Sequence, residues 1–272
     1  MSAVALCLCL CISTVLLIVA ILWVVGCPSF RRERLVNQTC VSHFITQNTI
    51  CIDLKTKVEK EWFLDFQSRW RGHEENINRV IIDLVSRIPP NSIILEAGGH
   101  VGDTTIMMGL QLKLLDNRSE VWSVEPDKTK VAFINKIVTE NDLAPFVKTF
   151  QFALSDKKSK GNIIRKKGSY LNGAGAWKVQ ESSTHAGEIK FTTIDDLYTS
   201  KKKLYLLKLD VEGFEIKALQ GGKNTIERFK PVVIVEAWKR NEQKISRCLS
   251  SLSYRKTSGK LNGDIVYYPV DS

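Results

Sequence analysis

Three carboxylates grouped around a glycine are the side chains of this chain best placed to do chemistry. Asp210, Glu212 and Glu215 follow a mostly apolar run that predicts a buried strand over residues 204–210. In open α/β sheets, ligands bind beyond the carboxyl ends of the strands. We therefore expect Asp210 and Glu212 to face a ligand, although Asp210 could instead cap the following helix. Glu215 is expected in the first turn of that helix, where its charge suits the helix dipole.

A glycine-rich turn follows an earlier apolar run, which predicts a strand over residues 92–96. Glycines between a strand and a helix permit close approach of the backbone to a ligand, and the helix N-terminus presents free N–H groups. Glu125 ends the next predicted strand, 125 − 102 = 23 residues after the last glycine of the turn. A carboxylate about 20 residues on grips the ribose hydroxyls in Rossmann-like sites. The predicted cofactor-binding residues are Glu96, Gly98, Gly99, His100, Gly102, Glu125 and Asp210.

The spacing of the turn distinguishes between nucleoside cofactors. The full Gly-x-Gly-x-x-Gly pattern is absent, which disfavours a nicotinamide cofactor. An acid at the start of the turn, a ribose acid on the next strand and a terminal β-hairpin favour S-adenosylmethionine. Methyl transfer to an alcohol requires alignment of the acceptor oxygen and a base for its proton. The predicted catalytic residues are Asp210, Glu212 and Glu236, which could alternatively hold a divalent metal, because carboxylates suit magnesium.

Helices and strands alternate along most of the chain. The predicted helices cover residues 56–71, 74–87, 102–115, 128–141, 215–221 and 242–250. The predicted strands cover residues 92–96, 120–124, 146–153, 188–193, 204–210 and 232–236, followed by a hairpin of 254–260 and 264–269. This alternation predicts an α/β fold with a mainly parallel sheet, helices on both faces and an antiparallel C-terminal hairpin. Asp195 and Asp196 are expected to begin a short helix, and the glycine-rich segment 167–177 is a candidate lid.

The N-terminal segment is apolar and uncharged. Residues 2–30 carry no charge, and the apolar stretch 4–25 has the ~20 residues that a spanning helix needs. We predict a membrane anchor at residues 1–30, an irregular juxtamembrane connector at 31–55 and the folded domain at 56–272. Arginines directly after the anchor favour a cytoplasmic body. Two glycosylation sequons, at Asn37 and Asn117, and a possible disulfide between Cys40 and Cys51 favour a lumenal one, and the sequence leaves the side open.

The net charge of +10 lies entirely after residue 30. Lysine clusters such as Lys157–Lys160 and Lys201–Lys203 are expected to be solvated loops, and a tethered basic body would be drawn toward anionic headgroups. Nucleic acid is an unlikely partner, because no aromatic residues alternate with the lysines to stack bases. The acceptor is left open among small molecules, lipids, glycans and proteins. The oligomeric state has no signal in the sequence.

The ordered set of motifs resembles the FkbM family of S-adenosylmethionine-dependent methyltransferases. The matching stretches are Leu95–Gly102, Val124–Pro126, Ala153–Asp156, Thr193–Leu197, Leu207–Glu215, Leu219–Gly222 and Lys230–Glu236. The resemblance implies a class I methyltransferase fold and, usually, O-methylation of a hydroxyl. His100 departs from it, since the family commonly has asparagine in the turn. The alternatives are an inactive membrane-anchored binding or trafficking protein on this fold and, more weakly, a nicotinamide-dependent enzyme.

Overall fold

The structure, a computed structural model, describes residues 38–165, 177–182, 184, 186–257, 259–261 and 263–270. The chain divides into two compact units, Met1–Cys40 and Val41–Ser272, and the fold described below is that of the second. The predicted anchor and most of the predicted lid at 167–177 lie outside the described residues. Within those residues, no helix is long and apolar enough to cross a membrane.

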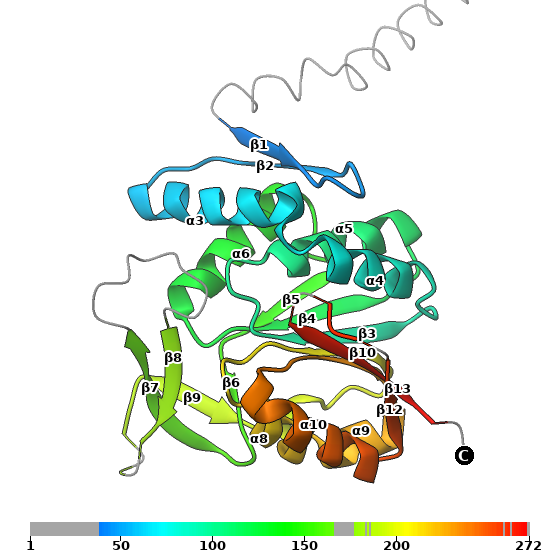
Figure 1. Cartoon of the computed structure of the whole chain (residues 1–272). Helices are drawn as coiled ribbons and strands as arrows, with labels where there is room; N and C mark the ends of the chain where they lie inside the picture. Colours follow the sequence, from blue (N-terminus) through cyan, green and yellow to red (C-terminus); the bar gives the residue numbers. More distant parts are fainter. Residues whose placement is uncertain are drawn as a thin grey trace, which may run out of the picture. The chain divides into compact units, whose positions relative to one another are not determined.

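A seven-stranded sheet forms the centre of the fold (Figure 1). Its strands are β3 Ser92–Ala97, β4 Glu120–Val124, β5 Val147–Phe150, β10 Lys203–Leu209, β11 Val232–Glu236, β12 Tyr254–Lys256 and β13 Asp264–Pro269. Their order is β12-β13-β11-β10-β3-β4-β5; the five strands from β11 to β5 run parallel, and β13 is antiparallel to both its neighbours. The predicted parallel sheet and antiparallel C-terminal hairpin are thus confirmed.

Helices cover both faces of this sheet, as predicted (Figure 1). On one side lie α4 Glu75–Ser86, α5 Asp103–Leu115 and α6 Lys128–Glu140, and on the other lie α8 Glu215–Gly221, α9 Lys223–Phe229 and α10 Lys239–Ser251. Successive strand residues point to opposite faces. Accordingly Ile94 packs in the cluster of α4 to α6, whereas Ile93 and Leu95 pack in the cluster of α8 to α10. Strand residues buried on both sides explain the continuous apolar runs of the sequence.

The N-terminal elements differ from the predicted irregular connector. Strands β1 Thr39–Ser42 and β2 Thr49–Ile52 form a two-stranded sheet, and Ile50 and Ile52 are fully buried. The side chain of Asn141, after α6, accepts from the Cys51 N–H and donates to the Cys51 carbonyl, both at 3.0 Å. Strands of four residues are too short to show a period in the sequence, so the interpretation of residues 39–52 as irregular was wrong.

Helix α3 Lys57–Ser68 begins at a capping box made by Thr56 and Glu59. The predicted helix over 56–71 is correct as far as Ser68; beyond it the chain forms a π-helical turn, η1 Arg69–His73, with Gly72 at φ 115°. Single π-helical turns occur frequently at functional sites. The aromatic stripe of α3 belongs to the core, because Trp62, Phe63, Phe66 and Trp70 are buried.

A second, four-stranded sheet is built from the segment after β5. Its strands are β6 Ala153–Leu154, β7 Ser159–Arg165, β8 Trp177–Glu181 and β9 Ile189–Thr192, in the order β6-β9-β7-β8. The single strand predicted over 146–153 is therefore two strands, and part of the predicted loop region is a hairpin of β7 and β8. Its lysines and glycine obscured the strand pattern. Helix α9 was also not predicted, and the short helix α7 Ile194–Leu197 confirms the prediction for Asp195.

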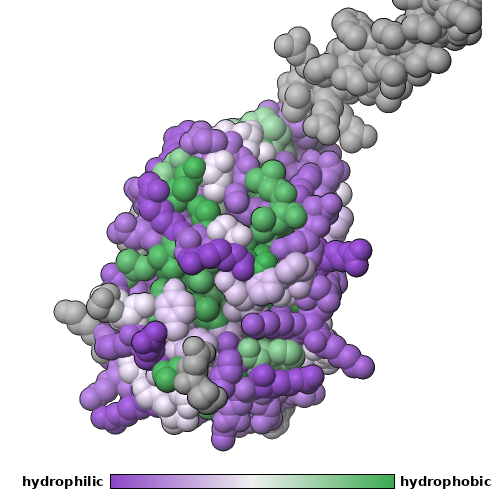
Figure 2. Space-filling view, turned by 90° about the vertical axis from the view of Figure 1, so that its right-hand side faces the viewer, coloured by the Kyte–Doolittle hydropathy of each residue, from purple (hydrophilic) through white to green (hydrophobic). Residues whose placement is uncertain are grey.

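The surface is predominantly hydrophilic on the face that Figure 2 presents, with smaller hydrophobic patches. Lys157, Lys158 and Lys160 are exposed, as predicted for solvated basic residues. Large apolar side chains that are exposed occur singly or in pairs along the sequence and comprise Val58, Leu64, Leu114, Leu115, Ile164, Trp238 and Val270. Scattered apolar residues of this kind are normal on protein surfaces.

Candidate active site

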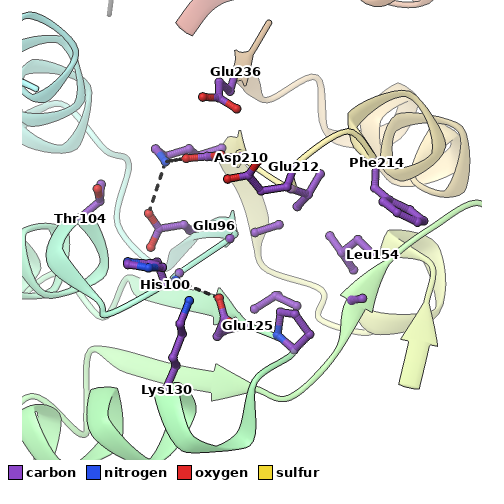
Figure 3. A pocket seen from close by; sticks show the side chains of 18 of the residues that line it. Glu96, His100, Thr104, Glu125, Lys130, Leu154, Asp210, Glu212, Phe214 and Glu236 are labelled. Carbon is purple, nitrogen blue, oxygen red and sulfur yellow. Dashed lines mark hydrogen bonds and ion pairs between the residues drawn. The ribbon is translucent and has the colours of Figure 1, made fainter. Parts of the chain in front are cut away.

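A cavity of about 160 Å³ lies at the carboxyl edge of the central sheet (Figure 3). Residues at the ends of β3, β4, β10 and β11 line it, so side chains from distant parts of the chain meet there. The predicted site residues that line it are Glu96, Gly98, Gly99, His100, Glu125, Asp210, Glu212 and Glu236. Gly102 is not among the lining residues; it begins α5 with φ 89° and packs on Ile134.

The glycine turn brings two strand ends into direct contact. Gly98 has φ 91°, and a Cβ there would stand 1.8 Å from the carbonyl oxygen of Asp210. A Cβ at Gly99 would stand 2.3 Å from the hydroxyl of Ser123. Only glycine fits such positions, because a Cβ requires about 3 Å or more from a neighbouring atom. The turn therefore holds the backbone of β3 against the end of β10, where Asp210 follows.

Glu125 is fixed at the cavity wall by the turn. Its two carboxylate oxygens accept the backbone N–H groups of His100, at 2.9 Å, and Asp127, at 3.0 Å. Burial raises the pKa of Glu125, and the Lys130 charge opposes this rise. His100 has φ 47°, and burial, together with Lys130 and Arg69, lowers its pKa well below the usual value, so its ring is neutral at pH 7. Its Nδ1 lies 3.5 Å from Asp65 Oδ2.

Glu96 belongs to a buried network behind the turn. The carboxyl is 1 % exposed, accepts the Thr105 hydroxyl and lies 3.8 Å from Lys208 Nζ. Burial raises the pKa of Glu96 to about 7, against the effect of Lys208. The same Lys208 Nζ lies 4.0 Å from Asp210 Oδ2. A single buried ammonium group therefore joins the acid that starts the glycine turn to the acid that ends β10.

The predicted catalytic acids gather at one end of the cavity (Figure 3). Asp210 donates its backbone N–H to Ala97 O at 3.0 Å and carries its carboxylate into the cavity. Burial, Asp210 and Glu212 together raise the pKa of Glu236 to about 8. Trp238 Nε1 donates to Glu236 Oε2 at 3.0 Å. Glu236 is therefore largely protonated at neutral pH.

The structural interpretations of other acids are confirmed. Glu215 lies in the first turn of α8, fully buried, and its Oε1 accepts the Gly213 N–H at 2.9 Å. The N-cap of α8 is Phe214, so Asp210 does not cap that helix. Asp195 accepts the N–H groups of Asn224 and Thr225 at the start of α9. In the part of the chain that the structure describes, no group of three His, Cys, Asp or Glu side chains is arranged to hold a metal ion.

Several lining residues were not found from the sequence. One side of the cavity is apolar and includes Phe152, Leu154, Ile163, Val179 and Phe214. Ile163 and Val179 come from β7 and β8, whose pattern gave no strand signal. Polar lining residues outside the predicted set are Arg69, Glu74, Asp103, Thr104, Lys130 and Lys208. Lys208 is a lysine within the apolar run before Asp210, and this unusual position could have marked it as a site residue. The sequence contains no comparable sign for Arg69.

Among the solved structures to which this chain is similar are three methyltransferases. An FkbM methyltransferase from Methylobacillus flagellatus KT is 17 % identical with a TM-score of 0.47; the match covers 67 % of this chain and 44 % of that one, so this chain spans less than half of that protein. A Geobacter sulfurreducens methyltransferase is 11 % identical with a TM-score of 0.46, over 80 % of this chain and 92 % of that one. The SAH-bound methyltransferase PaMTH1 from Podospora anserina is 10 % identical with a TM-score of 0.42, over 80 % and 89 %.

The family assignment rests on the sequence of the domain itself. No curated protein sequence matches the chain significantly. The family model for the methyltransferase FkbM domain matches residues 96–256, which include the glycine turn, Glu125, the acids after β10 and the end of β11. The α/β architecture agrees with the class I methyltransferase fold expected from the motifs. The chain belongs to the FkbM family of methyltransferases.

Proposed function

We propose that this chain transfers a methyl group from S-adenosylmethionine to a hydroxyl group of its acceptor. The observation that carries the proposal is that one cavity combines an apolar side, a fixed buried carboxylate and a cluster of acids. In Figure 3, Leu154 and Phe214 lie on one side of the cavity, Glu125 lies below, and Asp210 and Glu236 lie above. The apolar side matches an adenine ring, the fixed carboxylate matches a ribose, and the cluster of acids matches a reaction centre that accepts a proton.

The residues present fit the cofactor. The apolar side chains provide a surface for adenine, and the Glu125 carboxylate, which has lone pairs beyond its two backbone hydrogen bonds, faces the place of the ribose hydroxyls. Gly98 lacks the Cβ that would fill the turn, so the backbone can approach a ligand closely. When bound, S-adenosylmethionine supplies an electrophilic methyl group on a sulfonium.

Asp210 is the proposed base for the acceptor hydroxyl. Lys208 Nζ lies 4.0 Å from its Oδ2, so a positive charge faces the carboxyl of Asp210. Glu236, whose pKa is raised to about 8, is protonated at pH 7 and able to donate a hydrogen bond. Glu212, at the same end of the cavity, adds negative charge. Positioning of the acceptor and removal of its proton are the tasks this arrangement can perform.

The first test separates cofactor binding from turnover. We expect Asp210→Asn to lower the turnover number by about 10²–10⁴-fold, the usual contribution of a general base. Its affinity for S-adenosylmethionine, measured by titration calorimetry, should change little. Glu125→Ala should instead weaken that affinity strongly. Equal losses of turnover number and of affinity for S-adenosylmethionine in each variant would contradict the two roles. If the folded wild-type protein does not bind S-adenosylmethionine, the result would favour a binding protein without catalytic activity.

We further propose that the apolar segment 4–25 anchors the domain in a membrane and that the domain lies on the lumenal or extracellular side. The lumenal side is supported by Cys40 and Cys51, each of which is disulfide-bonded, since disulfides persist in oxidising compartments. The acceptor is then a small molecule, lipid or glycan reachable from that side. A glycosidase-sensitive mass shift that Asn117→Gln reduces would support this side. A domain that is protected from protease in intact cells but digested once the plasma membrane alone is permeabilised would oppose it, because only a cytoplasmic domain behaves in this way.

A further inference from the structure

Part of the cavity wall comes from a segment that the family-model match does not include. The match begins at residue 96, yet Arg69, in the π-helical turn η1, and Glu74, directly after it, line the cavity. Asp103, the first residue of α5, lines it beside them. The turn is held in place by Trp70, which is fully buried and donates its indole N–H to Asp103 O at 3.0 Å. The polar groups of this wall are therefore positioned by a packed aromatic anchor.

The charges of this wall are mixed and close together. Arg69 Nη1 lies 3.0 Å from Glu74 Oε1, while Arg69 Nε lies 3.6 Å from Asp65 Oδ1 and 4.0 Å from Asp103 Oδ1. The Arg69 side chain is 13 % exposed and that of Asp103 is 8 % exposed. Among the described residues, Arg69 Nε and Asp65 Oδ2 have no hydrogen-bond partner. One guanidinium thus stands among three carboxylates, and its hydrogen-bonding capacity is only partly used.

The position of this wall in the cavity indicates which part of the cofactor it would face. Thr104, which follows Asp103 and donates its hydroxyl to Asp103 Oδ2 at 3.4 Å, lies across the cavity from Leu154 and Phe214 (Figure 3). Glu125 lies between the two sides. If adenine occupies the apolar side and ribose lies at Glu125, the remaining part of the cofactor extends toward this mixed-charge wall. That part is an α-amino acid end, with one carboxylate and one ammonium group.

We propose that Arg69, Glu74 and Asp103 form a binding site for the α-amino acid end of the cofactor, with Arg69 pairing with its carboxylate and the two acids with its ammonium. This inference rests on the proposed function and assigns binding residues to the N-terminal region for that reaction. A guanidinium beside carboxylates complements a zwitterion in both charge and hydrogen bonding.

The electrostatics of the wall agree with this geometry. Burial and the neighbouring Asp103 raise the pKa values of Glu74 and Asp65, and Arg69 opposes the rise in both. Lys208 also opposes the rise of Glu74, and Lys130 that of Asp65, so this side of the cavity holds charges of both signs, as a zwitterionic ligand requires.

The test uses two ligands that differ only in the amino acid end. S-Adenosylhomocysteine carries it, whereas 5′-methylthioadenosine keeps adenine, ribose and sulfur but lacks it. We expect Arg69→Met to weaken binding of the first ligand by ~10–100-fold, as for loss of a charged hydrogen bond, and to leave the second unchanged. Arg71→Met, an exposed arginine of the same π-helical turn, is the matched control and should bind both as the wild type does.

The outcomes separate this inference from the proposed function. If the wild type binds neither ligand, the proposed function fails. If the wild type binds both ligands, and Arg69→Met lowers both affinities equally or changes neither, the cofactor site stands but the assignment of Arg69 is wrong. Should Arg69→Met fail to fold, Glu74→Gln carries the test, because it removes the charge at nearly constant shape. A Glu74→Gln variant that binds S-adenosylhomocysteine more weakly than the wild type does, but 5′-methylthioadenosine equally well, supports the site. A variant whose affinities for both ligands change by the same factor, or not at all, overturns it.

Discussion

At the scale of single residues, the acid pair Asp210 and Glu236 is the feature of this site with the clearest chemical consequence. The two carboxyls lie at the ends of neighbouring parallel strands, β10 and β11. Lys208 lies beside Asp210, whereas Glu236 faces Asp210, Glu212 and the indole N–H of Trp238. These neighbours keep Glu236 protonated at neutral pH, whereas Asp210 has a cation beside it. The two acids therefore have different roles although their side chains are alike.

Glu236 should make the stability of the protein depend on pH. Its pKa is about 8 in the folded state against the ordinary glutamate value of 4.5 in the unfolded chain, so between these pH values the folded state binds a proton that the unfolded state has released. Stability from this group is therefore lost as pH rises from about 4.5 to about 8. We expect the difference between the melting temperature of Glu236→Gln and that of the wild type to increase from pH 5 to pH 9.

The comparison between the two proteins reports Glu236 together with the groups coupled to it. Glu96, whose pKa burial raises to about 7, titrates in both proteins and its effect cancels in the difference. Asp264 pairs with Glu236 across the strands, so its titration changes with the substitution and belongs to the measured difference. A melting-temperature difference that stays constant with pH, measured by differential scanning fluorimetry, would show that Glu236 holds no extra proton in the folded protein.

At the scale of elements, the contact between the glycine turn and the end of β10 sets the geometry of the site. Gly98 and Gly213 both have positive φ values, 91° and 101°, but their surroundings differ. A Cβ at Gly98 would overlap the Asp210 carbonyl, whereas a Cβ at Gly213 would meet nothing within 4 Å. The first glycine is required by backbone contact as well as by conformation, and the second by conformation alone.

The two glycines therefore provide a matched pair of substitutions. Gly213→Ala should lower the free energy of unfolding by about 1 kcal/mol, because alanine is strained at positive φ. Gly98→Ala should cost several-fold more and also weaken S-adenosylmethionine binding, since β3 and β10 must separate. Urea unfolding and calorimetry measure both effects. Similar losses of stability in the two variants would contradict the role assigned to the contact.

At the scale of the whole molecule, the domain extends beyond the residues of the family match. Residues Val41 to Ala97 contribute β2, α3, η1, α4 and β3. The buried residues of β2, α3, η1 and α4 join the same core as α5 and α6, whereas β3 contributes Ile94 to it and Ile93 and Leu95 to the core of the other face. Cys40 and Cys51 are each disulfide-bonded, while Cys248 is the free cysteine in the described part. Packing, together with the hydrogen bonds between Asn141 and Cys51, therefore attaches the residues before the family match to the rest of the domain.

Oxidation of Cys40 and Cys51 should be measurable on the full chain. In denaturant without reductant, alkylation followed by mass spectrometry should label Cys248 but neither Cys40 nor Cys51. Reduction should lower the free energy of unfolding by about 2–4 kcal/mol, the typical effect of a disulfide. Labelling of Cys40 and Cys51 before reduction would instead indicate free thiols and remove the support for a lumenal domain.

The sequence by itself determined the α/β class, the elements of the central sheet and the acidic and glycine residues of the cavity that follow its strands. It could do so because buried strands leave continuous apolar runs, and because Glu96, Glu125, Asp210 and Glu236 each directly end or follow such a run. The carboxyl ends of parallel strands meet at one edge of a sheet whatever the rest of the chain does. Local pattern was therefore sufficient for these residues.

Only the tertiary structure decided what surrounds them. Ile163 and Val179 reach the cavity because a polar segment folds as a hairpin beside it, and Arg69 reaches it because a π-helical turn is anchored by Trp70. Such positions depend on contacts between residues far apart in the chain, which leave no periodic signal. The protonation of Glu236 likewise depends on burial and on the distance to neighbouring acids. These quantities exist only once the chain has folded.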